Sequence, residues 1–355
     1  MDDKSVFGFQ WHITDRCNLR CTHCYQENFS GSNELDLNGL KQIADEIIKT
    51  LAKWGKKGDI AITGGEPLVK TEMLPLVGYL NSADEVFSID ILTNGTLIEE
   101  DLVAQIRNFQ KIRCVQISLD GASPETNDRI RGKGSFEKAI TGIRLLRKQG
   151  IRVNIMYTLQ RQNMKDIPLI IDLANAEEVS TLTIERMVPT GTGKNLKNQL
   201  LSPKEIREVF EYISERAEHM DKATTSISRT RPLWVMCANS KDIGQSSCVL
   251  ESDSETGGVC SVGLDGLCIL PDATVLPCRR LPIPIGDLKR DSLEKIWFTS
   301  DLLWQIADKR NLKGKCNSCE FVTRCSGCRA MAYAYTGDYL AEDPQCWKED
   351  YKKEE

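Results

Sequence analysis

The chain has 355 residues, of which 41% are hydrophobic and 27% charged, which is the balance of a soluble globular protein. A net charge of −5, without any block of lysine and arginine, argues against nucleic acid and anionic membranes as partners. The sequence has no signal peptide and no apolar stretch of membrane length, so we expect a cytoplasmic protein.

The first two-thirds of the chain alternate strand patterns with helix patterns. Strands are predicted at 8–14, 59–63, 87–93, 113–119, 152–158 and 181–187, several of them as near-continuous apolar runs. Such repeats form parallel sheets, and six units are too few for a closed eight-stranded barrel. We therefore predict an α/β fold over residues 1–222, a partial (β/α)6 barrel of the TIM type.

Helices are predicted between these strands. Apolar residues recur at helical spacing over 40–51. Ser135 is predicted as the N-cap of a helix that ends at Gly150. Ser202 and Glu205 have the spacing of a capping box and predict a further helix start.

The pattern changes after about residue 222. A polar stretch at 242–258 is predicted as loop, and ten of the fourteen cysteines lie between Cys237 and Cys346. In a chain without an export signal, so many cysteines indicate metal. Only three histidines are present, and thiolates suit iron–sulfur clusters. We predict that residues 223–355 form a bridging region and a small cysteine-rich α+β iron–sulfur domain, in a protein that works best without oxygen.

Three cysteines directly follow the first predicted strand. Cys17, Cys21 and Cys24 form a C-x3-C-x2-C loop followed by an aromatic residue. Three thiolates bound to a four-iron cluster leave one iron free to bind a small molecule. Ligands of parallel α/β folds sit at the carboxyl ends of strands, so the position suits a reactive cluster. The alternatives are a zinc knuckle and a cluster used only for electron transfer.

The loop resembles the cluster loop of the radical S-adenosylmethionine (SAM) enzymes. The second strand runs into Gly64, Gly65, Glu66 and Pro67, which resemble the GGEP element of that family. The resemblance implies that this element holds the amino group of SAM, with glycines that let backbone approach the ligand and a Glu66 carboxylate that meets the amine. The alternative is a tight strand-to-helix turn.

Further strand ends resemble positions of the family that contact SAM. Asn94 follows the third strand, and Ser118 and Asp120 follow the fourth in a Ser-x-Asp-Gly sequence. The resemblance implies contacts from these residues and from Tyr25, with Arg129 or Arg131 as a countercharge and Arg186 in a similar role. The alternative for each arginine is a solvated surface ion pair.

The C-terminal cysteines resemble the SPASM extension of radical SAM enzymes. Two departures are visible: Ala273 stands where the family has glycine, and the last internal gap is x2 instead of x3. The resemblance implies one auxiliary cluster on Cys260, Cys268, Cys278 and Cys328, and another on Cys316, Cys319, Cys325 and Cys346. The cofactors would then be three [4Fe-4S] clusters and SAM.

Three cysteines remain outside these sets. Cys114 is predicted to be a small buried hydrophobe, and Cys237 or Cys248 could replace Cys268 as a ligand. Structural zinc is the rival interpretation of the C-x2-C pairs.

The resemblance implies reductive cleavage of SAM and abstraction of a hydrogen atom from the substrate. We expect a peptide or protein substrate that is crosslinked or oxidised; a tetrapyrrole side chain is the alternative, and a non-catalytic multi-cluster electron carrier is an alternative of another class. Arg279 stands where sulfatase-maturing relatives have aspartate, and Arg279, Arg280 and Arg329 could meet substrate carboxylates. The expected partners are a flavodoxin or ferredoxin and, since sixteen residues precede Cys17, a separate leader-peptide-binding protein. No catalytic acid or base is assigned.

Overall fold

The computed structural model describes residues 6–220, 225–237 and 260–348. In these ranges ten strands form one sheet in the order β10-β9-β8-β1-β2-β3-β4-β5-β6-β7. The strands are β1 (Val6–His12), β2 (Lys57–Thr63), β3 (Val86–Thr93), β4 (Ile112–Ser118), β5 (Val153–Leu159), β6 (Thr181–Arg186), β7 (Ser226–Ser228), β8 (Gly266–Ile269), β9 (Thr274–Leu276) and β10 (Gly286–Asp287). The predicted loop at 242–258 lies outside the described residues.

All six predicted strands are confirmed, with ends that differ by one or two residues. They form the parallel series β1 to β6, which β7 extends beyond β6. On the other side β8 pairs in parallel with β1, so that Gly8 lies opposite Gly266 and Trp11 opposite Ile269. The cysteine-rich C-terminal region therefore adds a strand to the barrel sheet, which the sequence did not predict, and β9 and β10 continue it in antiparallel pairing.

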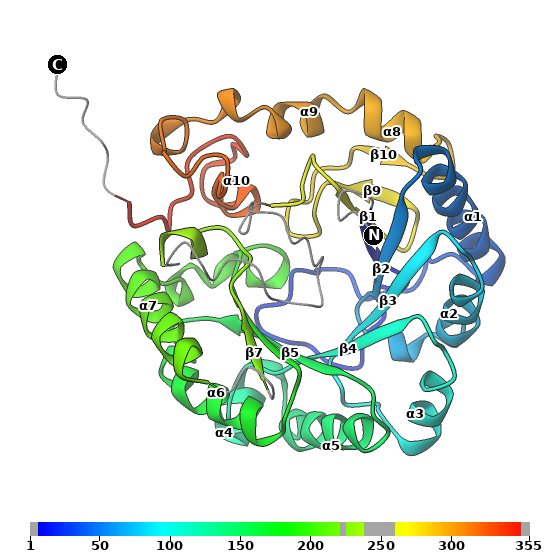
Figure 1. The fold of residues 1–355 in the computed structure, drawn as a ribbon, viewed down its shortest axis with the longest axis horizontal. Coiled ribbons are helices and arrows are strands. Elements are labelled where there is room, and N and C mark those ends of the chain that lie inside the picture. Colours follow the sequence, from blue (N-terminus) through cyan, green and yellow to red (C-terminus); the bar gives the residue numbers. More distant parts are fainter. Residues whose placement is uncertain (1–5, 221–224, 238–259, 349–355) are drawn as a thin grey trace.

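Helices surround the barrel on its outer side, as Figure 1 shows for α1 to α3 and α5 to α7. The helices are α1 (Leu37–Trp54), α2 (Met73–Asn81), α3 (Glu100–Ile106), α4 (Pro124–Arg131), α5 (Ser135–Lys148), α6 (Ile167–Ala176), α7 (Pro203–His219), α8 (Leu293–Thr299), α9 (Asp301–Ala307) and α10 (Arg329–Thr336). The last three lie together at the top of the view in Figure 1, beside the opening that the sheet leaves between β7 and β10.

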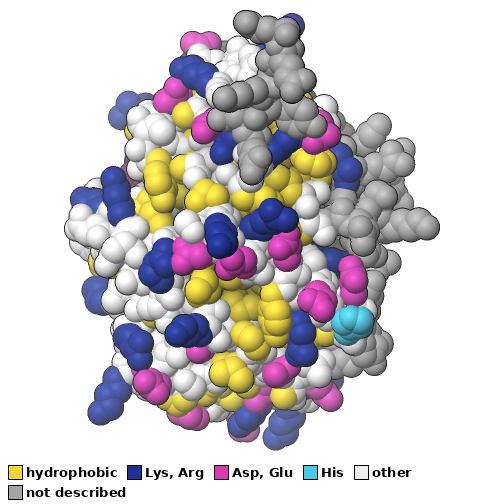
Figure 2. Space-filling model, turned by 90° about the vertical axis from the view of Figure 1, so that its left-hand side faces the viewer, with side chains coloured by type: hydrophobic (Ala, Val, Ile, Leu, Met, Phe, Trp, Pro, Cys, Tyr) yellow, Lys and Arg dark blue, Asp and Glu magenta, His cyan; other side chains and the backbone are white. Residues whose placement is uncertain are grey.

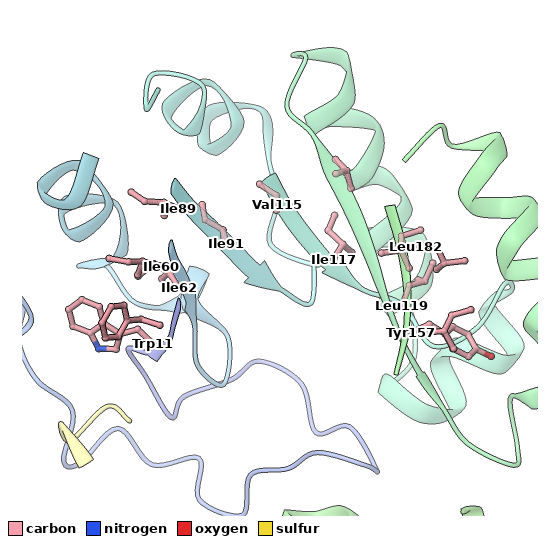
Figure 3. Packing of buried hydrophobic residues seen from close by; sticks show 14 of the residues in the cluster. Trp11, Ile60, Ile62, Ile89, Ile91, Val115, Ile117, Leu119, Tyr157 and Leu182 are labelled. Atoms are coloured by element: carbon pink, nitrogen blue, oxygen red, sulfur yellow. The ribbon is translucent and has the colours of Figure 1, made fainter. Parts of the chain in front are cut away.

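The main core lies between the sheet and these helices. Ile60, Ile62, Ile89 and Ile91 point from β2 and β3 towards the helical layer, and all four are fully buried (Figure 3). Because side chains alternate along a strand, the residues between them face the inside of the barrel. The inner face carries buried polar groups as well, including Asp59, Asp90, Gln116 and Asn154. Several strands are therefore less purely apolar than we predicted.

Two predicted helix starts have different outcomes. The capping box of α7 is confirmed: Ser202 Oγ accepts from Glu205 N at 3.3 Å, and Glu205 Oε2 accepts from Ser202 N at 2.7 Å. The prediction that Ser135 is an N-cap is wrong by one residue, because Gly134 takes that position. Asp128 accepts from the backbone N–H groups of Gly134 and Phe136 and so satisfies the start of α5 from the preceding helix.

The surface has mixed charge. On the face shown in Figure 2, lysine and arginine side chains alternate with aspartate and glutamate, and hydrophobic groups lie between them in small areas. Among the described residues no helix combines the length and apolar character that a membrane crossing requires.

Candidate functional site

A cavity of about 340 Å³ occupies the inside of the barrel and its opening. The lining includes thirteen of the twenty-two site residues predicted from the sequence: Cys17, Cys21, Cys24, Tyr25, Gly64, Gly65, Asn94, Ser118, Arg131, Arg186, Cys260, Cys268 and Cys278. The parallel strands explain this gathering, since their carboxyl ends all meet at one edge. Residues from both ends of the sequence thus line one cavity.

The three N-terminal cysteines are mutual neighbours at the cavity wall. Burial is the main factor that raises the pKa of the Cys21 thiol to about 11, while the nearby Arg131 opposes it. Donors surround the sulfur atoms: Leu19 N lies 3.4 Å from Cys17 Sγ, and Arg131 Nη1 lies 3.9 Å from Cys21 Sγ. Three thiols with N–H donors and a cation beside them are suited to a negatively charged thiolate–iron cluster.

The two glycines after β2 are required by a close approach within the chain itself. Gly65 N donates to Thr14 O at 2.8 Å, and Glu66 N donates to Arg16 O at 2.9 Å. A Cβ on Gly64 would lie 2.5 Å from Thr14 O, and one on Gly65 would lie 2.6 Å from Asp15 O. The glycines therefore allow the backbone that leads into the cysteine loop to pack closely against the end of β2, and they also line the cavity.

The Glu66 carboxylate is buried behind the cavity wall. It accepts from Thr93 Oγ1 and from Asn94 N, each at 2.7 Å, and from Leu68 N at 3.1 Å. Burial raises the pKa of Glu66 to about 7, and these donors act in the opposite direction. Glu66 is the N-cap of η2 (Pro67–Val69), so the Gly-Gly-Glu-Pro element is also the strand-to-helix turn that we considered as its alternative.

Asp120 is fully buried and holds two cavity residues in place. Arg131 Nε lies 2.7 Å and His23 Nε2 lies 3.2 Å from Asp120 Oδ2, and Thr158 N donates to Asp120 Oδ1 at 2.7 Å. Arg129 does not join this group: its side chain is 54% exposed and pairs with Glu125 on the outside of α4. Two residues along a helix correspond to about 200°, so only one of the two predicted arginines can face the cavity. The structure selects Arg131.

Arg186 at the end of β6 makes a bidentate ion pair with a C-terminal carboxylate. Its Nη1 and Nη2 atoms lie 3.0 and 2.8 Å from the oxygens of Asp343, and Gln345 Oε1 accepts a further bond at 3.0 Å. The pair is buried on both sides. Arg186 thus connects the barrel to the C-terminal cysteine region, which is a positioning role that the sequence did not indicate.

A segment after β6 covers the cysteine loop, and the sequence analysis missed it. Thr192 Oγ1, within η4 (Gly191–Asn195), lies 3.1 Å from Cys24 O, and Gly193 N donates to the same carbonyl at 3.2 Å. Gly191 has a φ of 59°, and a Cβ there would collide with the backbone of Tyr25. The Gly-x-Gly sequence that begins four residues after the predicted strand 181–187 was the available signal.

The first predicted auxiliary set is brought together, with Cys268 at its edge. Burial, followed by the neighbouring Cys278 and Cys328, raises the pKa of the Cys260 thiol to about 11. Burial raises the pKa of the Cys268 thiol on β8, while the nearby Arg279 acts to lower it and Cys278 acts to raise it. Ala273, the residue found in place of glycine, has a φ of 72°, a left-handed conformation that glycine adopts more readily than alanine.

The second predicted set surrounds a small cavity of about 20 Å³. Cys316, Cys319, Cys325 and Cys346 all line it. Arg329 Nη2 lies 3.9 Å from Cys316 Sγ, and its Nη1 donates to the carbonyls of Tyr339 and Ala341. Our expectation that Arg329 could meet a substrate carboxylate is wrong, because this side chain is 1% exposed and faces the cysteine site.

The remaining cysteines lie apart from these groups where they are described. Cys114 is buried on β4, as predicted, and its sulfur lies 3.3 Å from Asp90 Oδ1. Burial raises the pKa of the Cys237 thiol. The charged neighbours that also act on this pKa are Glu211, Arg207 and Arg229, and no described cysteine is among them. Cys248 lies outside the described residues.

A group of arginines lines the cavity next to Cys278. Arg231 Nε and Arg280 Nη1 lie 2.7 and 3.2 Å from the two carboxylate oxygens of Glu185. Arg279 lies over the ring of Tyr25, with 4.6 Å between its guanidinium carbon and the ring centroid. The sequence drew attention to Arg279 and Arg280 but missed Arg231 and Glu185, which come from other parts of the chain.

Two family models match this sequence. Residues 11–174 match the radical SAM superfamily, and residues 260–320 match SPASM, the iron-sulfur cluster-binding domain. The first range contains the N-terminal cysteine loop and the strand ends β1 to β5, and the second contains Cys260, Cys268, Cys278, Cys316 and Cys319.

Individual proteins of known activity resemble the chain over nearly its full length. An AdoMet-dependent heme synthase of Methanosarcina barkeri is 30% identical over 340 residues, covering 95% of both chains. Mycofactocin maturase MftC of Mycolicibacterium smegmatis is 28% identical, covering 95% of this chain and 81% of its own. The crystal structure of Streptococcus suis SuiB bound to precursor peptide SuiA superposes with a TM-score of 0.75 at 16% identity, covering 97% and 76% of the two chains. The SuiB match supports the fold alone.

Proposed function

The chain belongs to the radical SAM superfamily and carries a SPASM iron–sulfur domain, and from this premise we propose that it modifies the side chains of a tetrapyrrole. The observation that carries the proposal is the cavity that joins the N-terminal cysteines to an arginine-lined wall beside Cys278. Tetrapyrroles of the haem type are flat, apolar rings with carboxylate side chains. Such a ligand needs an enclosed apolar space with cations at its edge.

We propose that Cys17, Cys21 and Cys24 hold the cluster that binds SAM. A cluster held by these residues would supply the electron for reductive cleavage of SAM, the chemistry that precedes abstraction of a hydrogen atom from the substrate. Asp120 keeps Arg131 beside Cys21, where its charge can balance thiolates or the SAM carboxylate. Gly64 and Gly65 form the wall next to this loop, and Asn94 and Ser118 supply polar groups from the neighbouring strand ends.

We propose two auxiliary clusters, on the ligand sets inferred from the resemblance. The four cysteines around the second cavity support the set Cys316, Cys319, Cys325 and Cys346. The mutual proximity of Cys260, Cys278 and Cys328 supports the other set, and Cys268, next to Cys278, is its fourth member. Sites with four thiolates leave no open iron, so these centres would serve electron transfer or stability.

The proposed boundary between barrel and cluster region stays at residue 222.

The barrel would partly shield a radical reaction from solvent. Cavity residues come from β1 to β6 and from the segment around Cys260 to Arg280, so substrate and SAM would share one space. We further propose a low-potential flavodoxin or ferredoxin as the electron donor and the cytoplasm as the location.

Product analysis tests the proposed function. Reduced, anaerobically prepared protein is incubated with SAM and iron coproporphyrin III, a haem-like tetrapyrrole with four propionates. We expect 5′-deoxyadenosine together with a tetrapyrrole of changed mass. C17A should form neither product and should keep the iron of the auxiliary sites, about two-thirds of the total in a three-cluster protein. Deoxyadenosine formation without any change in the tetrapyrrole would reject the substrate class.

A peptide substrate is the second candidate. It was our first expectation from the sequence, and it is favoured by the 28% identity to mycofactocin maturase MftC over 95% of this chain. A short precursor-peptide gene beside the gene for this chain, and a mass change of that peptide on incubation with the reduced protein and SAM, would support it over the tetrapyrrole. A separate leader-peptide-binding protein would then be expected as a partner.

A further inference from the structure

Five arginines line the cavity, and four of them form ion pairs with carboxylates. Arg131 pairs with Asp120 at 2.7 Å, and Arg186 pairs with Asp343 at 2.8 Å. Arg231 and Arg280 share Glu185. These ion pairs explain how buried guanidinium groups are tolerated in the wall, since an unpaired buried charge is costly.

Arg279 is the exception. Among the residues that the structure describes, its guanidinium has no ion pair and no hydrogen bond, and its Nε atom is buried without a partner. Its guanidinium stacks instead on the ring of Tyr25. The charge of Arg279 acts to lower the pKa of Asp15, but no ion pair joins the two side chains in the described part of the chain. Up to five N–H donors are thus available at one place in the cavity wall.

In the cavity wall that includes Arg279, the arginines outnumber the carboxylates that pair with them. Glu185 supplies one negative charge for both Arg231 and Arg280, so Arg279 adds to a wall that already has a surplus cation. The other cavity carboxylates, Asp59 and Asp90, are engaged by Arg113. An anionic ligand group is therefore attracted to this part of the cavity.

The place of Arg279 in the chain adds a positional argument. It directly follows Cys278 of the first auxiliary set and stacks on Tyr25, which directly follows Cys24 of the N-terminal loop. A ligand group held here lies between the two cysteine sites.

We propose that Arg279 binds a propionate carboxylate of the tetrapyrrole substrate and so orients the ring between Cys24 and Cys278. This inference rests on the proposed function and deepens it. A carboxylate can accept two parallel bonds from a guanidinium, which fixes both the distance and the angle of the side chain that carries it. The competing assignment is that Arg279 balances the charge of the metal centres.

Equilibrium dialysis of the anaerobic, cluster-loaded protein against iron coproporphyrin III tests the proposal. Losing a hydrogen-bonded charge pair weakens binding about tenfold to a hundredfold, and this is the expected rise in Kd for R279Q. R279K should lie between R279Q and the wild type, because it keeps the charge but not the fork. R290Q is the matched control, since the Arg290 side chain is 82% exposed and pairs with Asp287, away from the cavity lining. Its Kd should equal that of the wild type.

Iron content and wild-type binding separate the outcomes. We expect R279Q to retain the iron of the wild type. Equal Kd values for R279Q and the wild type would overturn the inference and leave the proposed function standing. Loss of iron from R279Q that accounts for its weaker binding would assign Arg279 to the metal centres instead, which also overturns it. Absence of binding to the wild type would overturn the proposed function, and the substrate class named here with it.

Discussion

Replacing Gly65 by alanine should disrupt the cysteine loop by displacing the backbone of Asp15 and Arg16, which precedes it. The Cβ would lie 2.6 Å from Asp15 O and 2.8 Å from Arg16 C, and both are backbone atoms that no rotamer change can move. Arg16 O would lie closer still to the Cβ, so the two chain segments must separate by more than about 0.4 Å to reach 3.0 Å, and by more than about 0.8 Å to reach an ordinary contact of 3.4 Å. The displaced segment leads directly into Cys17.

The energetic cost follows from the bonds that this separation weakens. Gly65 N to Thr14 O and Glu66 N to Arg16 O join the two segments at 2.8 and 2.9 Å. Each such bond contributes about 1 kcal/mol, and the steric strain adds to their loss. We expect G65A to lower the free energy of unfolding by about 2–4 kcal/mol and to impair formation of the N-terminal cluster.

Anaerobic protein is assayed for iron content, for the change in the cluster signal when SAM is added, and for stability in urea. G78A is the matched control, because among the described residues a Cβ on Gly78 in α2 would meet just the ring of Phe109, at 3.4 and 3.9 Å, and the change removes a helix-weakening glycine. It should be neutral or stabilising by up to about 1 kcal/mol. A G65A variant with wild-type iron, stability and response to SAM would refute the argument that these glycines exist to seat the loop.

Three further predictions concern the residues around the site and the frame that supports it. D120N leaves the buried Arg131 without its counter-ion and should lower the free energy of unfolding in urea by about 3 kcal/mol. The control D338N removes a more exposed ion pair and should lower it by less than about 1 kcal/mol. Similar losses for both variants would contradict the role given to Asp120. S202A removes the capping box of α7 and should cost about 1 kcal/mol, with no change in iron content; a stability equal to the wild type would show that this cap is dispensable. Burial lowers the pKa of His23 to about 4, against the charge of Asp120, so the folded protein binds fewer protons than the unfolded chain between about pH 6.5 and 4, and stability falls as the pH falls through that window. From pH 7.5 to 5.5 the loss from this group is roughly 1 kcal/mol, and H23Q should lack this share; the same pH slope in both proteins would argue against it.

The sequence was most informative where the chemistry depends on local spacing. The loop of Cys17, Cys21 and Cys24, the Gly-Gly-Glu-Pro element and the six strands could all be predicted because each is specified within a few consecutive residues. The capping box at Ser202 is of the same kind. Ser135 was predicted wrongly as an N-cap because the groups that satisfy the start of α5 come from Asp128, in the preceding helix.

The arginines show what the sequence could not decide. Arg129 and Arg131 have similar surroundings in sequence, and only the rotation of α4 decides which of them faces the cavity. Arg329 follows a predicted cluster cysteine, as Arg279 does, yet it is buried against Cys316.

By itself the sequence determined the order of the strands and helices and the family, because hydrophobic period, capping groups and metal-ligand spacing are properties of neighbouring residues. Only the tertiary structure decided which charges remain unpaired. The partners of Arg131, Arg186, Arg231 and Arg280 come from other strands, loops and the C-terminal region, and Arg279 stands out only after those ion pairs are known. The energy of a buried charge depends on everything that surrounds it in space, and that information is not contained in any one segment of the chain.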